Sequence, residues 1–231
     1  MKCRALLFDL DGVLVDSRAA DELVWRTWAA ERRVDADALI RAGQGRRSSE
    51  TLRDVHPHLD IAAEAALLDA MEERETTGIR AAAGARAMLD GLEVHHWAIV
   101  TSASRPVATM RLTVAGLPIP RVFVTGDQVE RGKPDPQGYL RAAALLEVQP
   151  AESLVFEDAP AGIAAGRAAG MRVVGVATTQ AVDAISFADL VVPGLDALRV
   201  AVTADGWIEI DDSPGLGVEV NREALQRFST G

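Results

Sequence analysis

The stretch RALLFDLDGVLVD, residues 4–16, is the most informative part of the sequence. It begins as an apolar run, and where the run ends it places two acidic residues, Asp9 and Asp11, followed by Gly12. Residues two apart on an extended chain project to the same side, so both carboxylates face one metal or phosphoryl group. Open parallel sheets bind ligands at this carboxyl edge, and glycine lets the backbone turn tightly there. The stretch therefore predicts a buried strand that ends in a ligand site.

Further apolar runs rich in Val, Ile and Leu have the length of buried strands. They occupy residues 96–100, 121–124, 153–156, 171–176 and 189–192. Helical stretches lie between most of them, for example residues 135–148, where Tyr139 and Ala143 fall on one face, and residues 159–169, which begin with a proline suited to a first turn. Alternating strands and helices predict an α/β fold in which a parallel sheet carries helices on both faces.

Residues 16 to 80 break this alternation, and we interpret them as an all-helical insert. Two amphipathic stripes occur at helical spacing, formed by Ala20, Leu23, Val24 and Trp28, and by Ile61, Ala65, Leu68 and Met71. The basic, glycine-bearing segment RAGQGRRSSET, residues 41–51, reads as a loop. Near the C-terminus we expect a last strand over residues 207–210, then a Ser-Pro-Gly turn and a short helical stretch.

Composition excludes several classes of protein. The chain has 231 residues, of which 48% are hydrophobic and 25% charged, so it can bury a sizeable core. Its 24 basic and 34 acidic residues give a net charge of −10, which opposes nucleic-acid binding. We see no apolar run of membrane-spanning length and no signal peptide at the N-terminus, and we expect a cytoplasmic enzyme without an obligate protein partner. The single cysteine, Cys3, reads as strand packing.

Two further motifs follow predicted strands and suit a phosphate group. Thr101 and Ser102 come directly after the strand at 96–100, where hydroxyls and backbone N–H groups hold phosphate oxygens. Ser and Thr are also ordinary helix caps, and we expect Ser104 to cap the next helix. In GKPDP, residues 132–136, the ammonium of Lys133 is placed to neutralise a phosphate and a nearby aspartate.

The last motif is FEDAPAG, residues 156–162, in which Glu157 and Asp158 end another apolar strand. Their carboxylates are hard oxygen donors, and together with Asp9 they suit a Mg²⁺ ion that keeps some of its waters. Each motif alone is a weak signal. Together, at four strand ends, they make a strong one.

This set of motifs resembles the haloacid dehalogenase superfamily of phosphotransferases over about residues 3–192, with order and spacing kept. The resemblance implies a Rossmann-like core of residues 1–15 and 82–231, and a small helical cap, residues 16–81, that closes over the active site. Most members are phosphatases. The dehalogenases lack the second acid and the metal, so Asp11 argues against dehalogenation.

The resemblance also implies a role for each motif residue. Asp9 would attack phosphorus and form an aspartyl phosphate, while Asp11 would protonate the leaving alkoxide and then deprotonate the hydrolytic water. Mg²⁺ would be held by the Asp9 carboxylate, the Asp11 backbone carbonyl, Asp158 and, directly or through water, Glu157. The phosphoryl oxygens would be taken by Thr101 or Ser102, by Lys133 and by amides near Leu10.

The cap segment GQGRRSSETLR, residues 43–53, is where specificity is expected. It resembles the corresponding segment of small sugar- and polyol-phosphate phosphatases, which implies a small phosphorylated metabolite as substrate. Arg46 or Arg47 would reach a substrate hydroxyl or phosphate, and Gly45 would allow close approach. The alternative is a solvated basic loop with Ser48 or Ser49 as an N-cap.

Two other functions stay open on the sequence. A β-phosphoglucomutase would share all four motifs, but Ser48 stands where its cap normally has an arginine, and its longer cap-to-core stretch is replaced by TTGIRAAAGA, residues 76–85. A binding domain with this fold and no activity is the other alternative. The intact acidic set argues against it, because a carboxylate cluster costs stability without a cation.

Overall fold

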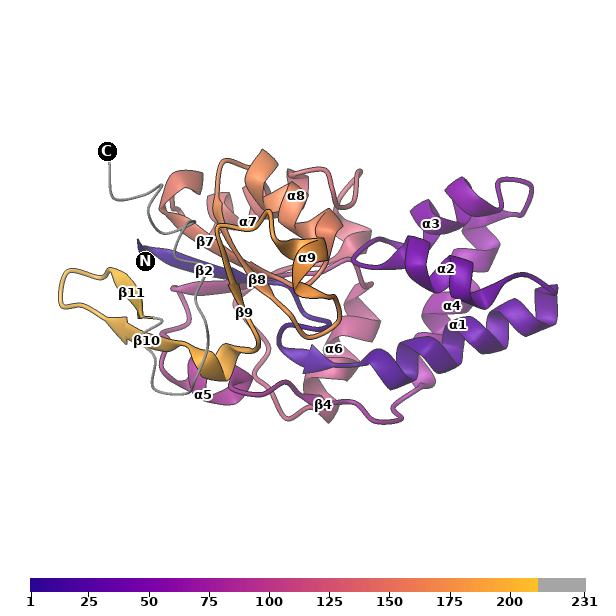
Figure 1. The fold of residues 1–231 in the computed structure, drawn as a ribbon, viewed down its shortest axis with the longest axis horizontal. Helices are drawn as coiled ribbons and strands as arrows, with labels where there is room; N and C mark the ends of the chain where they lie inside the picture. Colours follow the sequence, from indigo (N-terminus) through magenta and orange to yellow (C-terminus); the bar gives the residue numbers. More distant parts are fainter. Residues whose placement is uncertain (212–231) are drawn as a thin grey trace.

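The computed structural model describes residues 1–211 and has a six-stranded parallel sheet at its centre (Figure 1). The strand order is β6-β5-β2-β7-β8-β9. The strands are β2 (Ala5–Phe8), β5 (Trp97–Val100), β6 (Val122–Val124), β7 (Ser153–Glu157), β8 (Arg172–Val176) and β9 (Leu190–Val192). Each predicted strand is confirmed to within one residue at either end, because runs of buried apolar residues between turn signals are unambiguous in a sheet covered on both faces.

Helices cover both faces of the sheet, as predicted. On β2, Leu6 and Phe8 belong to one apolar cluster and Leu7 to another, because successive side chains of a strand point to opposite faces. The first cluster includes α5 (Ala85–Asp90) and α6 (Arg105–Val114). The second includes α7 (Gln137–Leu145), α8 (Pro160–Ala168) and α9 (Val182–Ile185). The fold is therefore a Rossmann-like three-layer core.

The insert is all-helical and has an apolar core of its own (Figure 1). It contains α1 (Arg18–Arg32), α2 (Ala36–Gly43), α3 (Ser48–Val55) and α4 (Ile61–Arg74). The chain enters and leaves it through two short antiparallel strands, β3 (Val15–Asp16) and β4 (Arg80–Ala81). Val15 pairs with Ala81, so the two ends of the insert lie side by side.

Two details of the predicted insert are wrong. Residues 41–51 are not one loop, because α2 extends to Gly43 and α3 begins at Ser48. Each of these helices has only eight residues and buries one or two side chains, so neither shows a clear apolar stripe. In α1, Leu23 is 45% exposed, whereas Trp25 is buried beside Val24 and Trp28. At 100° per residue, Leu23 lies outside the arc that faces α2 and α4.

The cap predicted for α6 is also different. Ser104 occupies the N-cap position, but its side chain makes no capping hydrogen bond. Instead Asp127, from the loop after β6, accepts a hydrogen bond from the backbone N–H of Arg105 at 3.1 Å. A carboxylate from another element thus replaces the expected local hydroxyl.

A second, antiparallel sheet joins the two ends of the described chain, with the order β1 (Lys2–Cys3), β11 (Ile208–Asp211), β10 (Arg199–Val202). The strand expected at 207–210 is β11, displaced by one residue. The buried thiol of Cys3 packs against β11, in agreement with its predicted structural role. The turn and helix expected after it lie outside the described residues. Across residues 1–211, every helix is too short or too polar to cross a bilayer.

The corrected face of α1 yields a stability prediction. Trp28→Ala should lower the free energy of unfolding by about 3–5 kcal/mol, because it empties the centre of the apolar core of the insert, the predicted cap. It also removes the indole N–H hydrogen bond to Glu64, which spans 2.8 Å. Leu23→Ala, on the same helix, should change the free energy of unfolding by less than about 0.5 kcal/mol. Urea denaturation followed by circular dichroism measures the stability of both variants. Similar losses of stability in the two would contradict the assignment of Trp28, and not Leu23, to the buried face of α1.

Candidate active site

The register of the central sheet brings the motif residues to one edge. Phe8 is paired with Ile99 on one side and with Phe156 on the other, and the rings of Phe8 and Phe156 stack with centroids 4.8 Å apart. The residues that follow these positions, including Asp9, Thr101 and Glu157, therefore emerge together at the carboxyl edge. Strand pairing alone places carboxylates from distant parts of the sequence next to each other.

Lys133 joins two of these carboxylates. Its Nζ lies 2.6 Å from Asp9 Oδ1 and 2.6 Å from Glu157 Oε1, and all three side chains are buried. Burial alone would lower the pKa of Lys133, but the carboxylates of Asp9 and Glu157 raise it above its ordinary value, so it stays an ammonium. The hydroxyl of Tyr139, on α7, donates to the same Glu157 oxygen at 2.6 Å. The helical pattern of the sequence predicts only a core position for Tyr139, because its polar contact depends on how α7 packs.

Asp9, Glu157 and Asp158 form a cluster that fits a divalent cation. Each offers a carboxylate oxygen, and the three oxygens lie within 4.8 Å of one another. Burial raises the pKa of Asp158 to about 7 and the pKa of Asp9 well above its ordinary value. Glu157 Oε2 is buried without a hydrogen-bond partner. When all three are ionised, the single ammonium of Lys133 leaves two negative charges, which match Mg²⁺ and its preference for oxygen ligands.

Two neighbours shape this cluster. The Thr179 hydroxyl donates to Asp158 Oδ2 and fixes its orientation. Gly12 has φ +81°, and a Cβ there would stand 2.1 Å from the same oxygen, so only glycine permits Asp158 to lie against the first motif. The glycine of the first motif is therefore required both for the turn and for the approach of the fourth motif.

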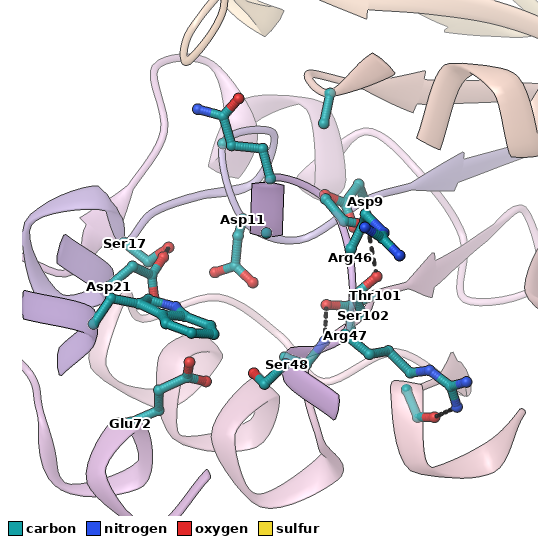
Figure 2. A pocket seen from close by; sticks show the side chains of 18 of the residues that line it. Asp9, Asp11, Ser17, Asp21, Arg46, Arg47, Ser48, Glu72, Thr101 and Ser102 are labelled. Carbon is teal, nitrogen blue, oxygen red and sulfur yellow. Dashed lines mark hydrogen bonds between the residues drawn. The ribbon is translucent and has the colours of Figure 1, made fainter. Parts of the chain in front are cut away.

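The Asp11 side chain is not part of the cluster. It points into a cavity of about 590 Å³ between the cap and the sheet edge, and Figure 2 shows it between Asp9 on one side and Asp21 and Glu72 on the other. Its Oδ2 lies 2.7 Å from Nη1 of Arg111. The two aspartates of the first motif thus meet different cations, Lys133 and Arg111, and only the backbone carbonyl of Asp11 is left for the expected metal contact.

The expected phosphate-holding residues lie in different settings. Thr101 and Ser102 both line the cavity. The hydroxyl of Thr101 accepts a hydrogen bond from the Ala103 N–H at 3.1 Å, whereas the hydroxyl of Ser102 donates to the Gly45 carbonyl at 2.9 Å and so binds the cap. The side chain of Leu10 is fully buried in the core, which leaves only its backbone for a ligand.

Arg46 and Arg47 line the cavity but are already paired with protein groups (Figure 2). Arg46 forms an ion pair with Asp54 at 2.6 Å. Arg47 donates to the carbonyls of Val129 and Glu130 at 2.9 and 2.8 Å, and so ties the cap to the loop that carries Lys133. The alternative of a serine N-cap is wrong, since Ser48 and Ser49 lie inside α3 and Arg47 holds the N-cap position without a side-chain bond.

Gly45 is a point of close approach between the cap and the core. It has φ +69°, and a Cβ there would stand 2.7 Å from the Cβ of Ala159, in the fourth motif. The glycine therefore allows a close approach to the core, and it also lines the cavity. A larger residue would hold the cap away from the sheet edge.

Arg111 and its acidic partners were missed in the sequence analysis. Arg111 is only 4% exposed, and besides Asp11 it pairs with Asp21 of α1 and, at 3.5 Å, with Glu72 of α4. Burial raises the pKa of Glu72 to about 8 and also raises that of Asp21. The available signal was an arginine on the apolar face of α6, between Ala108 and Leu112. The spacing of the residues gave no indication of its partners, which lie on other helices.

The geometry supports nucleophilic chemistry on an anionic group. A buried carboxylate, Asp9, lies beside an ammonium and a candidate cation site, at the end of a cavity. A second carboxylate, Asp11, stands close by with one oxygen free of hydrogen bonds. This arrangement suits transfer of a phosphoryl group to Asp9 with proton transfer by Asp11.

Several known proteins are similar to this chain. A family model described as haloacid dehalogenase-like hydrolase matches residues 6–176. Hexitol phosphatase A of Escherichia coli is 42% identical over 215 residues, covering 91% of this chain and 100% of the relative. Glycerol-1-phosphate phosphohydrolase 2 of Saccharomyces cerevisiae is 32% identical and covers 87% and 86%. The crystal structure of β-phosphoglucomutase from Clostridium difficile shares the fold, with a TM-score of 0.71 at 22% identity, and covers 85% and 93%.

The acidic cluster yields a metal-binding prediction. Isothermal titration of the protein with Mg²⁺ should show one site, and Asp158→Asn should weaken it at least about tenfold, or about 1.4 kcal/mol, by removing a charged oxygen ligand. Asp183→Asn, on the exposed start of α9, should bind Mg²⁺ as the wild type does. Equal affinities for the wild type and Asp158→Asn would place the cation elsewhere.

Proposed function

Because the chain belongs to the haloacid dehalogenase-like hydrolase family and is a phosphoric monoester hydrolase, we propose that it hydrolyses the monophosphate of a small sugar or polyol through an aspartyl phosphate on Asp9. The observation that carries this proposal is the 2.6 Å contact between Lys133 and Asp9 at the carboxyl edge of the sheet. It supplies a nucleophile and a fixed positive charge at one end of the cavity.

In the first half-reaction Asp9 attacks phosphorus and the ester P–O bond breaks. Lys133 reduces the repulsion between the carboxylate and the phosphate, and the Thr101 hydroxyl and the backbone after Asp9 hold phosphoryl oxygens. Mg²⁺ at Asp9, Glu157, Asp158 and the Asp11 carbonyl would supply further neutralisation of charge when bound. Asp11 gives its proton to the leaving alkoxide.

In the second half-reaction Asp11, now a carboxylate, takes a proton from water. The water oxygen bonds to phosphorus, the Asp9–P bond breaks, and inorganic phosphate leaves with both aspartates restored. The helical unit between β3 and β4, which we propose to be a cap of residues 16–81 on a core of the remaining residues, limits the access of bulk water. Its contacts through Arg47 and Gly45 support this role.

The side chains that line the cavity support a hydroxyl-rich monophosphate. Away from Asp9 they include Ser17, Ser48 and Asp69, whose oxygens accept hydrogen bonds from substrate hydroxyls, and the Asp69 carboxylate repels a second phosphate. The arginines that line the cavity are each paired with a carboxylate, and they are Arg18, Arg46, Arg47 and Arg111. The relatives named for hexitol and glycerol phosphates act on compounds of this class.

Phosphate release from a panel of sugar, polyol and nucleotide monophosphates and sugar bisphosphates tests the proposal. With Mg²⁺, hexitol or glycerol phosphates should be the best substrates, with kcat/KM at least about tenfold above that of bisphosphates, and EDTA should abolish release. Asp9→Asn should lower kcat at least about 10³-fold while the protein stays folded. Full activity of Asp9→Asn would rule out the aspartyl phosphate. Absence of release from every compound would instead favour a mutase or a binding domain.

Cap closure yields a separate prediction. Gly45→Val should lower kcat/KM about 10- to 100-fold with an unchanged circular dichroism spectrum, because the added side chain meets Ala159 and displaces the cap from the reacting groups. Gly43→Ala is the matched control, since its Cβ meets nothing closer than 3.5 Å. It should stay within about threefold of the wild type. A loss of the same size in both variants would argue against a specific contact at residue 45.

A further inference from the structure

We propose that Arg111 is the positioning residue for Asp11, and that the cap residues Asp21 and Glu72 complete its coordination, so that alignment of the proton-transfer group depends on the cap. This inference rests on the proposed function, in which Asp11 transfers the protons. Arg111 is buried and lies outside the four sequence motifs.

The two oxygens of Asp11 are treated differently. Oδ2 lies 2.7 Å from Arg111 Nη1, whereas Oδ1 is shielded from solvent and has no hydrogen-bond partner among the described residues. Asp11 lines the cavity together with Asp9 (Figure 2). One oxygen is therefore held in place by Arg111, and the other is free of protein hydrogen bonds. A carboxylate anchored in this way is restricted to few rotamers, which is what a positioned acid and base requires.

The shape of the guanidinium explains why an arginine stands here. Nη1 faces Asp11, while Nη2 contacts Asp21 and lies 3.5 Å from Glu72. The hydroxyl of Ser17 donates to the other oxygen of Asp21 at 2.8 Å and orients it. A planar fork reaches all of these groups at once, whereas a lysine ammonium, as a single point charge, does not.

The partners of Arg111 come from different parts of the molecule. Arg111 is on α6 of the core, Asp21 is on α1 and Glu72 is on α4, so the ion pairs cross from the core to the cap. Helices α4 and α6, which carry Glu72 and Arg111, also pack against each other. Displacement of the cap would therefore remove two of the three carboxylates that hold the guanidinium, and Asp11 would lose its fixed neighbour.

The charges argue against Arg111 as a phosphate-binding residue. Burial alone would lower its pKa, but Asp11, Asp21 and Glu72 raise it, so the guanidinium stays charged. Its charge is shared among the three carboxylates of Asp11, Asp21 and Glu72. An anionic substrate would have to displace these partners to reach it.

The test uses two substrates that differ in their need for a proton. A polyol phosphate expels an alkoxide, which needs the proton of Asp11, whereas p-nitrophenyl phosphate expels a stable phenolate, which does not. Since kcat/KM covers only the steps up to the phosphoenzyme, the ratio of the two values reports acid catalysis. Arg111→Lys should lower kcat/KM for the polyol phosphate about 10- to 100-fold, and that for p-nitrophenyl phosphate less than about threefold.

Cap variants and controls complete the experiment. Glu72→Gln and Asp21→Asn should show the same selective loss at about 3- to 10-fold, and they carry the test if Arg111→Lys does not fold. Arg26→Met removes an exposed cap arginine that pairs with Asp37 at 2.8 Å, and it should leave both substrates unaffected. Asp11→Asn should show the selective loss at its largest.

The outcomes separate this inference from the proposed function. Equal losses of kcat/KM on both substrates in the Arg111, Glu72 and Asp21 variants would mean that the cluster only stabilises the structure. Unchanged kcat/KM values would mean that the contact with Asp11 does not contribute to catalysis. Either result overturns the inference if Asp11→Asn still shows a selective loss. If the wild type releases no phosphate, or Asp11→Asn keeps full activity on the polyol phosphate, the proposed function itself fails.

Discussion

The crowding of like charges at one edge of the sheet is the constraint on which the rest of the structure depends. Asp9, Glu157 and Asp158 are buried within 4.8 Å of one another, and burial of unpaired carboxylates is strongly unfavourable. Lys133, Tyr139 and Thr179 each contact this group, and each comes from a different segment. Their contacts lower the electrostatic penalty without cancelling the charge. What is left matches the charge of a divalent cation, and the same imbalance creates an attractive site for a phosphate held by that cation.

The two aspartates of the first motif are each paired with a different cationic side chain. Asp9 faces Lys133 at the base of the cavity, and Asp11 turns toward Arg111 beneath the cap. Residues only two positions apart thus sit in different electrostatic surroundings, which would let one motif supply both the nucleophile and the proton-transfer group of the proposed mechanism. The division depends on α6, because that helix carries the arginine.

The cap meets the core at two places on opposite sides of the cavity. On one side Arg47 and Gly45 lie against the loops that carry Lys133 and Ala159. On the other side Asp21 and Glu72 meet Arg111. The first contact is one of close packing and carbonyl hydrogen bonds, and the second is an ion-pair cluster. Because both surround the reacting groups, the position of the cap, the shape of the cavity and the surroundings of Asp11 are linked.

The sequence by itself determined the sheet, its helical layers, the inserted helical unit and the group of motif residues at the strand ends. The elements follow from local periodicity, and the rule that parallel strands end at one edge brings Asp9 and Glu157 together, whereas Lys133 was singled out by its motif. Tertiary structure alone decided the rest. Leu23 is exposed where the sequence predicted burial, Trp25 joins the core of the insert, Arg46 and Arg47 are paired with protein groups, and Arg111 contacts Asp11, Asp21 and Glu72. These outcomes depend on how separate helices pack, because an ion pair between residues as far apart in the chain as Asp11 and Arg111 leaves no periodic trace in the sequence.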